Sequence, residues 1–363
     1  MNQPIMKSPT AASEQSVAAP IAGNQIRVSI IAAADVEPWV AIGIHDAFWA
    51  VGTLWNRVMG EQEAPRFLPE IVAAEHGSLM TATGVRIEPH RTFREGAQTD
   101  IVFVPSLLMA SGAQFGRDNP DLIDWVRRAY AQGALIVSAC TGAFLLAEAG
   151  LLDGKEATTH WAFIDTLRAE YPNVRVLPDR ILVSAAEDHR IVTSGGATSW
   201  SDLVLYLVGR FAGPEEARRL AKMSLFDWHH NGQNPYSRMT TRTQANDKVI
   251  QECQTWLASH YAECDPVAAM IKLTGLSRRT FNRRFKTATS HSPLEYVQRV
   301  RIEEAKQILE TTDQPVESIA SEVGYGDAVA FRRLFKRLAV DTPAVYRRRK
   351  RIPDSVREMG IAC

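Results

Sequence analysis

Aromatic and basic side chains recur at a fixed interval of fifty residues in the last third of this chain of 363 residues. The first copy holds Phe281, Arg283, Phe285, Lys286, Pro293, Tyr296 and Arg299, and the second holds Phe331, Arg333, Phe335, Lys336, Pro343, Tyr346 and Arg349. Such a repeat indicates one supersecondary unit that is used twice. On a helix, this spacing places both Phe side chains on one face and the basic side chains on another. The pattern predicts two helices that pack on a core and contact a polyanion.

The segments that would position these two helices are also repeated. A short helix is predicted over residues 265–275, followed by a turn and by Ser277 as the N-cap of the first basic helix. Residues 315–325 and Asp327 are the equivalents in the second copy. A helix, a turn and a basic helix form a helix-turn-helix unit, whose second helix enters the major groove of DNA. A connecting helix over residues 294–310 would hold the two units at a rigid spacing.

Positions on and just before the two basic helices are candidates for contact with DNA. They are Ser277, Arg278, Arg279, Thr280, Asn282, Arg283, Asp327, Ala328, Val329, Arg332, Arg333 and Lys336. Arg and Lys can bind guanine, Asn can bind adenine, and apolar side chains can contact the methyl group of thymine. Alternatively, the basic side chains are only solvated, or Arg283 and Arg333 form ion pairs within the domain. The four repeated Phe side chains are expected in the core.

Residues 246–350 resemble the DNA-binding domain of the AraC/XylS family. The resemblance rests on the run RIEEAKQILETTDQPVESIASEVGYGDAVAFRRLFKRLAVDTPAVYRR, which is close to the family signature. It implies sequence-specific binding of double-stranded DNA and favours activation of transcription over repression. Ser290 and Val340 stand where the family usually has Gly, three residues before each repeated Pro. The turn after each basic helix is therefore expected to differ from the family pattern.

Cys140 is the second feature with chemical potential. An apolar run over residues 134–138 leads into Ala-Cys-Thr-Gly and then into a helical pattern. Such a turn would place Cys140 at the carboxyl end of a sheet, beside helix amides that lower a thiol pKa and can bind an anion. The arrangement has the geometry of a nucleophile elbow. His160 lies twenty residues further on and could act as a base.

Short apolar runs predict the strands that would hold Cys140 in place. They cover residues 26–33, 100–105, 134–138 and 190–194. Helical patterns such as residues 121–132 lie between them. Strands that alternate with helices predict an α/β domain around a mostly parallel sheet. Beyond about residue 246 the sequence is typical of helix throughout, so the second domain is expected to be all-α.

The length of the chain fits two domains. The expected division is a tail (1–24), an α/β domain (25–228), a linker (229–245), an all-α domain (246–351) and a C-terminal tail (352–363). The formal net charge is zero. It is unevenly distributed, because residues 246–363 hold 20 Lys and Arg against 15 Asp and Glu. A basic second domain joined to an acidic first one suits a sensor attached to a DNA-binding unit.

Several classes of protein are disfavoured by the composition. The four cysteines, Cys140, Cys253, Cys264 and Cys363, form no C-x-x-C pair, which argues against a disulfide framework or a zinc site. His229 and His230 are adjacent and would point apart, so no metal is expected, and no cofactor is expected either. No apolar run approaches the ~18 residues of a membrane span. The first residues do not form a signal peptide, and a cytoplasmic location is expected.

The runs ALIVSACTGAFLLAEAGLLDGKEATTHW and RIVTSGGATSWSDLVLYLV resemble the ThiJ/PfpI group of the class I glutamine-amidotransferase-like superfamily. Together with the AraC-type segment, the whole chain resembles the GlxA-type transcriptional regulators. The resemblance implies a flavodoxin-like sheet with a ligand pocket at its edge. The pocket residues that it implies are Cys140, Thr141, His160, Gly195, Gly196 and Ala197, with an acidic partner at Asp35 or Glu37.

The resemblance implies a regulator that senses a small molecule, such as an amino acid or another nitrogen compound, and forms a homodimer through the α/β domain. Thr141 stands where the peptidase-like members have His, which favours a pocket role without turnover for Cys140. The Cys-Thr pair is also similar to the isonitrile hydratase branch. A cysteine-dependent hydrolase or hydratase that carries a DNA-binding domain is therefore the alternative, and a nucleoid-structural protein is a third possibility.

Overall fold

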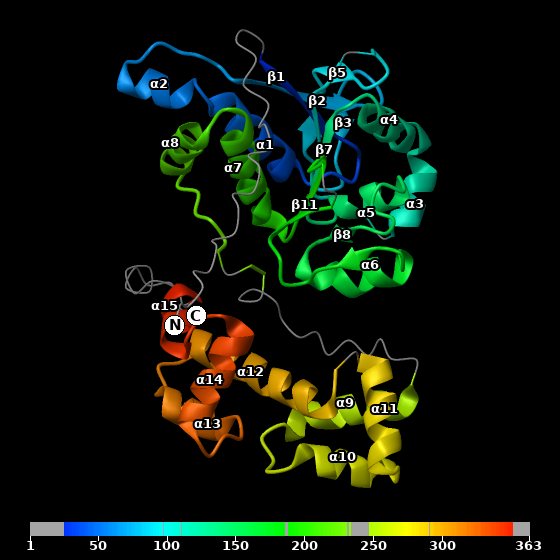
Figure 1. Cartoon of the computed structure of the whole chain (residues 1–363), viewed down its shortest axis with the longest axis vertical. Coiled ribbons are helices and arrows are strands. Elements are labelled where there is room, and N and C mark those ends of the chain that lie inside the picture. Colours follow the sequence, from blue (N-terminus) through cyan, green and yellow to red (C-terminus); the bar gives the residue numbers. More distant parts are fainter. Residues whose placement is uncertain are drawn as a thin grey trace, which may run out of the picture.

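The computed structural model describes residues 25–96, 98–109, 111–185, 188–230, 232–233, 247–289 and 291–350 (Figure 1). The two expected tails, most of the expected linker and Ser290 lie outside these residues. Strands and helices alternate in the first part of the chain, and the part from residue 247 onward is helical. The prediction of an α/β domain followed by an all-α domain is confirmed.

A seven-stranded sheet forms the centre of the α/β domain. The strand order is β10-β11-β7-β6-β1-β2-β5, and every neighbouring pair is parallel except β10 with β11. The strands are β1 (Ile26–Ile31), β2 (Phe67–Ala73), β5 (Arg91–Thr92), β6 (Ile101–Val104), β7 (Leu135–Ala139), β10 (Leu182–Ser184) and β11 (Ile191–Ser194). The four apolar runs correspond to β1, β6, β7 and β11, so these strand predictions are confirmed.

Helices cover both faces of this sheet. They are α1 (Pro38–Ala50), α2 (Leu54–Met59), α3 (Gly112–Asp118), α4 (Pro120–Ala131), α5 (Gly142–Glu148), α6 (Ile164–Glu170), α7 (Trp200–Phe211) and α8 (Pro214–Ser224). In Figure 1, α1, α7 and α8 lie on one side of the sheet, and α3 and α4 lie on the other. Because both faces are covered, every residue of β6 and β7 is buried, which explains their unbroken apolar runs.

The parallel strands end at one edge of the sheet, where the candidate site residues gather. The loops after β1, β6, β7 and β11 hold Glu37, Ser106, Cys140 and Gly196. Ligands of open α/β sheets bind at this edge. The domain also contains two short strands and two 3-10 helices, which are β8 (Glu156–Ala157), β9 (Arg175–Val176), η1 (Trp161–Phe163) and η2 (Ala197–Ser199). A further small sheet pairs β3 (Leu79–Met80) with β4 (Arg86–Ile87).

The all-α domain contains the two predicted helix-turn-helix units. Its helices are α9 (Lys248–His260), α10 (Pro266–Thr274), α11 (Arg278–Thr289), α12 (Pro293–Thr311), α13 (Val316–Glu322), α14 (Ala328–Ala339) and α15 (Pro343–Lys350). The first unit is α10 with α11, the second is α13 with α14, and α12 connects them. No helix in the described part of the chain is long and apolar enough to cross a membrane.

The fifty-residue repeat is visible in the packing of the two cores. All four repeated Phe side chains are completely buried, which confirms their assignment to the core. The Phe285 and Tyr296 rings have centroids 5.3 Å apart and meet at 78°. The equivalent rings of Phe335 and Tyr346 are 5.5 Å apart and meet at 79°. The two cores are therefore built on one plan, as the sequence repeat indicates.

Arg301 of α12 joins the two units through a buried guanidinium group. Its nitrogens donate to the carbonyl oxygens of Tyr261 (2.7 Å), Glu263 (2.6 Å) and Gly324 (3.0 Å). Tyr261 and Glu263 lie just before α10, and Gly324 lies in the turn before α14. The guanidinium also lies over the Tyr325 ring, 5.0 Å from its centroid. One side chain thus fixes the turn of the second unit against the first.

Val340 ends α14 with φ 69° and ψ −36°. A β-branched side chain is rarely found at positive φ, where Gly is favoured. Val340 is one of the two positions at which the sequence departs from the Gly of the family pattern. The backbone at this turn therefore has a conformation that suits Gly, at a position where this chain has Val.

Candidate functional sites

Cys140 lies at the turn between β7 and α5 with φ 56°, a conformation that non-glycine residues seldom adopt. Two hydrogen bonds hold this turn. The Cys140 N–H donates to the carbonyl oxygen of Ser194 (3.1 Å), and the Thr159 hydroxyl donates to the Cys140 carbonyl oxygen (2.8 Å). A strained residue held by its surroundings is typical of a nucleophile elbow.

The Cys140 thiol is buried, with 4% of the residue exposed. Burial raises the pKa of the Cys140 thiol, and the charge of Glu37 raises it further, while hydrogen bonds involving Ser106 and Thr141 lower it. The combined effect is a raised pKa of the Cys140 thiol. This is opposite to the lowering by helix amides that the sequence suggested, because removal of the thiolate from water has the larger effect. The thiol is therefore protonated at neutral pH.

Thr141 and the acidic residues Asp35 and Glu37, which the sequence singled out together with Cys140, have different roles around the thiol. The Thr141 hydroxyl donates to the Leu107 carbonyl oxygen (2.7 Å) and accepts from the Leu107 N–H (2.9 Å), so it fastens the turn to the loop after β6. Glu37, rather than Asp35, is the acidic residue whose charge acts on Cys140. Oε2 of Glu37 is buried and has no hydrogen-bond partner in the described part of the chain.

His160 and Gly196 line a cavity of about 210 Å³ at the same edge of the sheet. The other lining residues are Trp161, Ile181, Thr198, Ser199, His229 and Gln233. Burial lowers the pKa of His160, so the ring is neutral at pH 7. Its Nδ1 accepts from the Ala162 N–H (3.1 Å), which leaves the proton on Nε2. Cys140, Thr141 and Asp35 are not among the residues that line this cavity.

Gln233 belongs to the expected linker, and no pattern in the sequence indicates its role. Its side chain is buried at the edge of the sheet, with 2% of the residue exposed. Its Oε1 accepts from the N–H groups of Gly196 (2.8 Å) and Trp161 (3.1 Å). Its Nε2, which has two hydrogens to donate, lies within hydrogen-bond distance of four oxygens, those of Thr159 (2.9 Å), Thr158 (3.2 Å), Arg180 (3.2 Å) and Pro178 (3.4 Å). Gly195 lies against it, because a Cβ there would be 2.3 Å from Cδ of Gln233.

His229 is a second anchor of the same segment. Its N–H donates to Oδ1 of Asp202 (2.8 Å), and its Nδ1 lies 2.6 Å from Oδ2 of the same carboxylate. Asp202 is completely buried in α7. From the sequence, no metal is expected at His229 and His230. In the described part of the chain, no group of three His, Cys, Asp or Glu side chains is arranged to hold a metal ion.

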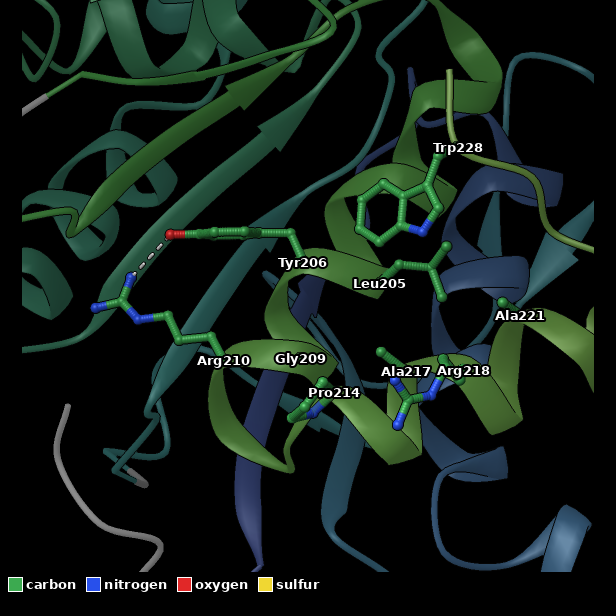
Figure 2. A pocket seen from close by; sticks show the side chains of 9 residues that line it. All are labelled: Leu205, Tyr206, Gly209, Arg210, Pro214, Ala217, Arg218, Ala221 and Trp228. Carbon is green, nitrogen blue, oxygen red and sulfur yellow. Dashed lines mark hydrogen bonds between the residues drawn. The ribbon is translucent and has the colours of Figure 1, made fainter. Parts of the chain in front are cut away.

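A larger cavity of about 480 Å³ lies between α7 and α8 (Figure 2). It is lined by Leu205, Tyr206, Gly209, Arg210, Pro214, Ala217, Arg218, Ala221 and Trp228. Tyr206 and Arg210 are joined by a hydrogen bond of 3.5 Å. None of the site residues expected from the sequence lines it. Trp228 directly precedes His229, so the segment before residue 234 also contacts this part of the domain.

The second helix of each helix-turn-helix unit has one buried and one exposed face. The Ser277 hydroxyl accepts from the Thr280 N–H (3.3 Å), and the Asp327 carboxylate accepts from the Val329 N–H (2.7 Å), so both predicted caps are confirmed. The exposed candidates are Ser277, Arg278, Arg279, Asn282, Arg283, Asp327, Val329, Arg332, Arg333 and Lys336, while Thr280 and Ala328 are half-buried. This face lies opposite the buried Phe side chains.

The sequence suggested ion pairs for Arg283 and Arg333 as an alternative to DNA contact. In α11 and α14 the ion pairs are instead formed by the adjacent residues Arg284 and Arg332. Arg284 binds the Asp247 carboxylate at 2.7 and 2.9 Å and holds the pKa of that carboxyl below its usual range. Arg332 forms an ion pair with Glu317 of α13. Among the described residues, Arg283 and Arg333 form no ion pair. These two side chains therefore present their charge on the exposed face.

Comparison with known proteins identifies both parts of the chain. Residues 49–210 match the DJ-1/PfpI family, and residues 270–349 match a helix-turn-helix domain. The HTH-type transcriptional regulator CdhR of Pseudomonas aeruginosa is 24% identical over 294 residues, which cover 79% of this chain and 84% of the relative. The HTH-type transcriptional regulator GlxA of Rhizobium meliloti is 26% identical over 62% of this chain and 68% of its own. The isonitrile hydratase of Pseudomonas putida is 34% identical over 142 residues, which cover 38% of this chain and 57% of that enzyme.

Proposed function

We propose that this chain, which joins a DJ-1/PfpI domain to an AraC-type helix-turn-helix domain, is a sequence-specific DNA-binding regulator of transcription. The observation that carries the proposal is that α11 and α14 share the same arrangement of buried and exposed side chains. Each helix buries two Phe side chains in its own core and exposes basic and polar side chains on the opposite face. The names of the relatives CdhR and GlxA, both HTH-type transcriptional regulators, support it.

The two units suit adjacent segments of one DNA duplex. The 19 residues of α12 span about 28 Å at 1.5 Å per residue. Successive major-groove segments on one side of the duplex lie about 34 Å apart. A rigid α12, fixed by Arg301, would therefore present α11 and α14 to neighbouring groove segments. Base preference would come from positions that differ between the copies, such as Arg279 against Val329 and Asn282 against Arg332.

We further propose that a small nitrogen compound, such as an amino acid, controls the protein from the α/β domain. The cavity at His160 and Gly196 is the proposed site, because it lies where ligands of open α/β sheets bind. Its volume of about 210 Å³ suits a ligand of that size. Cys140 and Thr141, at the turn whose Cys140 carbonyl oxygen accepts from the Thr159 hydroxyl, would then shape the surroundings of this cavity. Activation of transcription is proposed over repression.

An enzymatic role for Cys140 is the second candidate, supported by its strained turn and by the isonitrile hydratase among the relatives. The buried thiol, its raised pKa and its position outside the cavity lining favour a non-catalytic role. The substitution Cys140→Ala separates the two. We expect full regulatory output from Cys140→Ala, whereas isonitrile hydration by the unmodified protein that Cys140→Ala abolishes would favour the enzyme.

A homodimer through the α/β domain is supported by an exposed apolar stripe on α1. Trp39, Ile42 and Trp49 are 50%, 40% and 44% exposed, and their spacing places them along one side of the helix. Val58 and Met59 at the end of α2 are also exposed. An apolar surface of this kind marks an association site. A second copy of the chain is the proposed partner, since a two-fold dimer pairs the same surface with itself.

The test of DNA recognition exchanges the residues that differ between the two basic helices. Operator sequences would be selected in vitro from random DNA with the full-length protein. The same selection would be repeated after Arg279 and Asn282 are exchanged with Val329 and Arg332. We expect the preferred bases to move, with a loss of about 1–3 kcal/mol for each base contact on the original operator. Salt-sensitive binding without site preference would refute the proposal and favour a nucleoid-structural protein.

A further inference from the structure

We infer that the groups around the Gln233 side chain form a binding site for primary carboxamides. This site, here called the amide cradle, consists of the N–H groups of Gly196 and Trp161 and of oxygens of Thr158, Thr159, Pro178 and Arg180. In this structure the chain's own Gln233 occupies the cradle. A free carboxamide ligand that took its place would release the segment that leads to the DNA-binding domain. The binding site is inferred from its geometry alone, whereas the regulatory consequence rests on the proposed function.

The cradle matches a primary carboxamide at both ends. The N–H groups of Gly196 and Trp161 point at the carboxamide oxygen, and four oxygens surround its nitrogen. A carboxylate would bring a negative charge against these oxygens and has no N–H to donate. An ammonium group could not accept from the two N–H groups. A primary carboxamide has the acceptor and the two donors that the cradle requires.

Bonds that do not involve Gln233 hold the cradle in shape. The Thr158 N–H donates to the Thr193 hydroxyl of β11 (2.8 Å). The Thr159 hydroxyl donates to the carbonyl oxygen of Cys140 (2.8 Å). The cradle is therefore fastened to the sheet and to the strained turn at Cys140. Removal of the Gln233 side chain would leave formed but unpaired N–H and C=O groups, which costs free energy unless another group binds them.

A free ligand has room beside the cradle. Gln233 and Gly196 both line the cavity of about 210 Å³, together with the neutral ring of His160. Gly196 has no side chain to separate the cavity from the cradle. A ligand could thus place its carboxamide in the cradle and the rest of its atoms in the cavity. His160 Nε2–H would be available to it as a donor.

The position of Gln233 in the chain connects this site with the DNA-binding domain. The segment is held at Trp228 in the cavity between α7 and α8 (Figure 2), at His229 on Asp202, and at Gln233 in the cradle. Asp247 caps α9, the first helix of the all-α domain. Gln233 is the last described anchor before that helix. Its release would move the anchor back to His229 and lengthen the tether of the DNA-binding domain.

Binding to the cradle can be tested on the full-length protein with propionamide as the probe. Propionate and N,N-dimethylpropionamide, which lack the N–H donors, are matched controls. We expect Gln233→Ala to bind propionamide at least about tenfold more tightly than the unmodified protein, in which Gln233 competes for the site. Gln132→Ala, at an exposed Gln after α4, should behave as the unmodified protein. Neither control compound should bind.

Hydrogen exchange at Trp161 and Gly196 provides the second readout. We expect faster exchange of these two N–H groups in Gln233→Ala, and slower exchange again when propionamide is added. Gln233→Glu, which keeps the shape but repels the oxygens, should bind propionamide like Gln233→Ala and guards against misfolding of one variant. Equal binding of all three compounds, or no gain of propionamide affinity in both variants, would overturn the inference.

The regulatory consequence is measured separately by footprinting on the selected operator. We expect Gln233→Ala to change the operator footprint or affinity relative to Gln132→Ala. An unchanged footprint together with tight propionamide binding would keep the carboxamide site and refute its link to DNA binding. Failure of the unmodified protein to bind any operator would refute the proposed function and leave the propionamide result unaffected.

Discussion

At the scale of single residues, Cys140 combines a backbone conformation typical of a nucleophile with a thiol that is poorly suited to be one. The positive φ directs the residue to the edge of the sheet. Burial then keeps the thiol protonated, and the charge of Glu37 acts in the same direction. A Cys in such surroundings resembles a packed apolar side chain more than a reactive one.

Cys140 is therefore expected to react with iodoacetamide about 100-fold more slowly than the exposed Cys264 at about pH 7.5. The reactive thiolate is scarce below the raised pKa of Cys140, so its rate should climb as the pH rises toward that pKa. Mass spectrometry of the two peptides over a series of pH values measures both rates. Comparable rates near neutral pH would contradict the buried, protonated thiol.

Val340 offers a test of backbone strain in the second helix-turn-helix unit. Val340→Gly is expected to raise the free energy of unfolding by about 1 kcal/mol, because Gly adopts φ 69° without steric conflict. The greater freedom of Gly in the unfolded chain offsets part of the gain. Urea unfolding measures the change. Val345→Gly within α15 is the control and should lower stability. A less stable Val340→Gly would contradict the strained turn.

The residues that escaped prediction share a physical reason. The Phe positions and the caps at Ser277 and Asp327 follow from side-chain spacing, which the sequence displays directly. Gln233 binds mostly backbone atoms of distant segments, and backbone atoms leave no mark in the sequence. It also lies in a polar stretch that is typical of a linker. Glu37 and Asp35 are two residues apart, and only the course of the loop after β1 decides between them.

At the scale of elements, α12 acts as the frame of the all-α domain. It begins with a capping box, in which Ser292 and Glu295 satisfy each other's backbone N–H groups. Its buried side chains belong to both cores, since Val297 packs in the first and Ile302 in the second. The helix therefore transmits the position of one unit to the other. Its approximate length was predictable from the sequence, but the role of Arg301 was not, because its partners are again backbone carbonyls.

Arg301→Met is expected to lower the free energy of unfolding by about 3 kcal/mol. The substitution removes three hydrogen bonds from a charged donor and leaves buried carbonyl groups unpaired. Arg299→Met, at an exposed position two residues earlier, should change stability by less than about 0.5 kcal/mol. Urea unfolding followed by circular dichroism compares the two variants. Equal losses in both would show that Arg301 does not join the units.

At the scale of the whole molecule, the net charge of zero conceals two unlike parts. The excess of basic residues after residue 246 supplies attraction to DNA, and the α/β part carries the opposite excess. We therefore expect most of the electrostatic attraction to DNA to come from the all-α domain. If each chain binds two groove segments, a dimer brings four recognition helices to one operator, and the second chain binds at a high effective concentration.

If the proposed dimer forms through α1, Trp39→Glu combined with Ile42→Glu is expected to convert it into a monomer and to weaken operator binding by about 100-fold or more. The two charges would lie in the apolar stripe of α1, where the partner copy would have to bury them. Analytical ultracentrifugation measures the oligomeric state, and fluorescence anisotropy measures operator affinity. Met80→Glu, which places a charge at another exposed apolar residue, is the matched control and should leave both unchanged. A double variant that still sedimented as a dimer would remove α1 from the interface, whereas a monomer with undiminished affinity would show that one chain suffices for the operator.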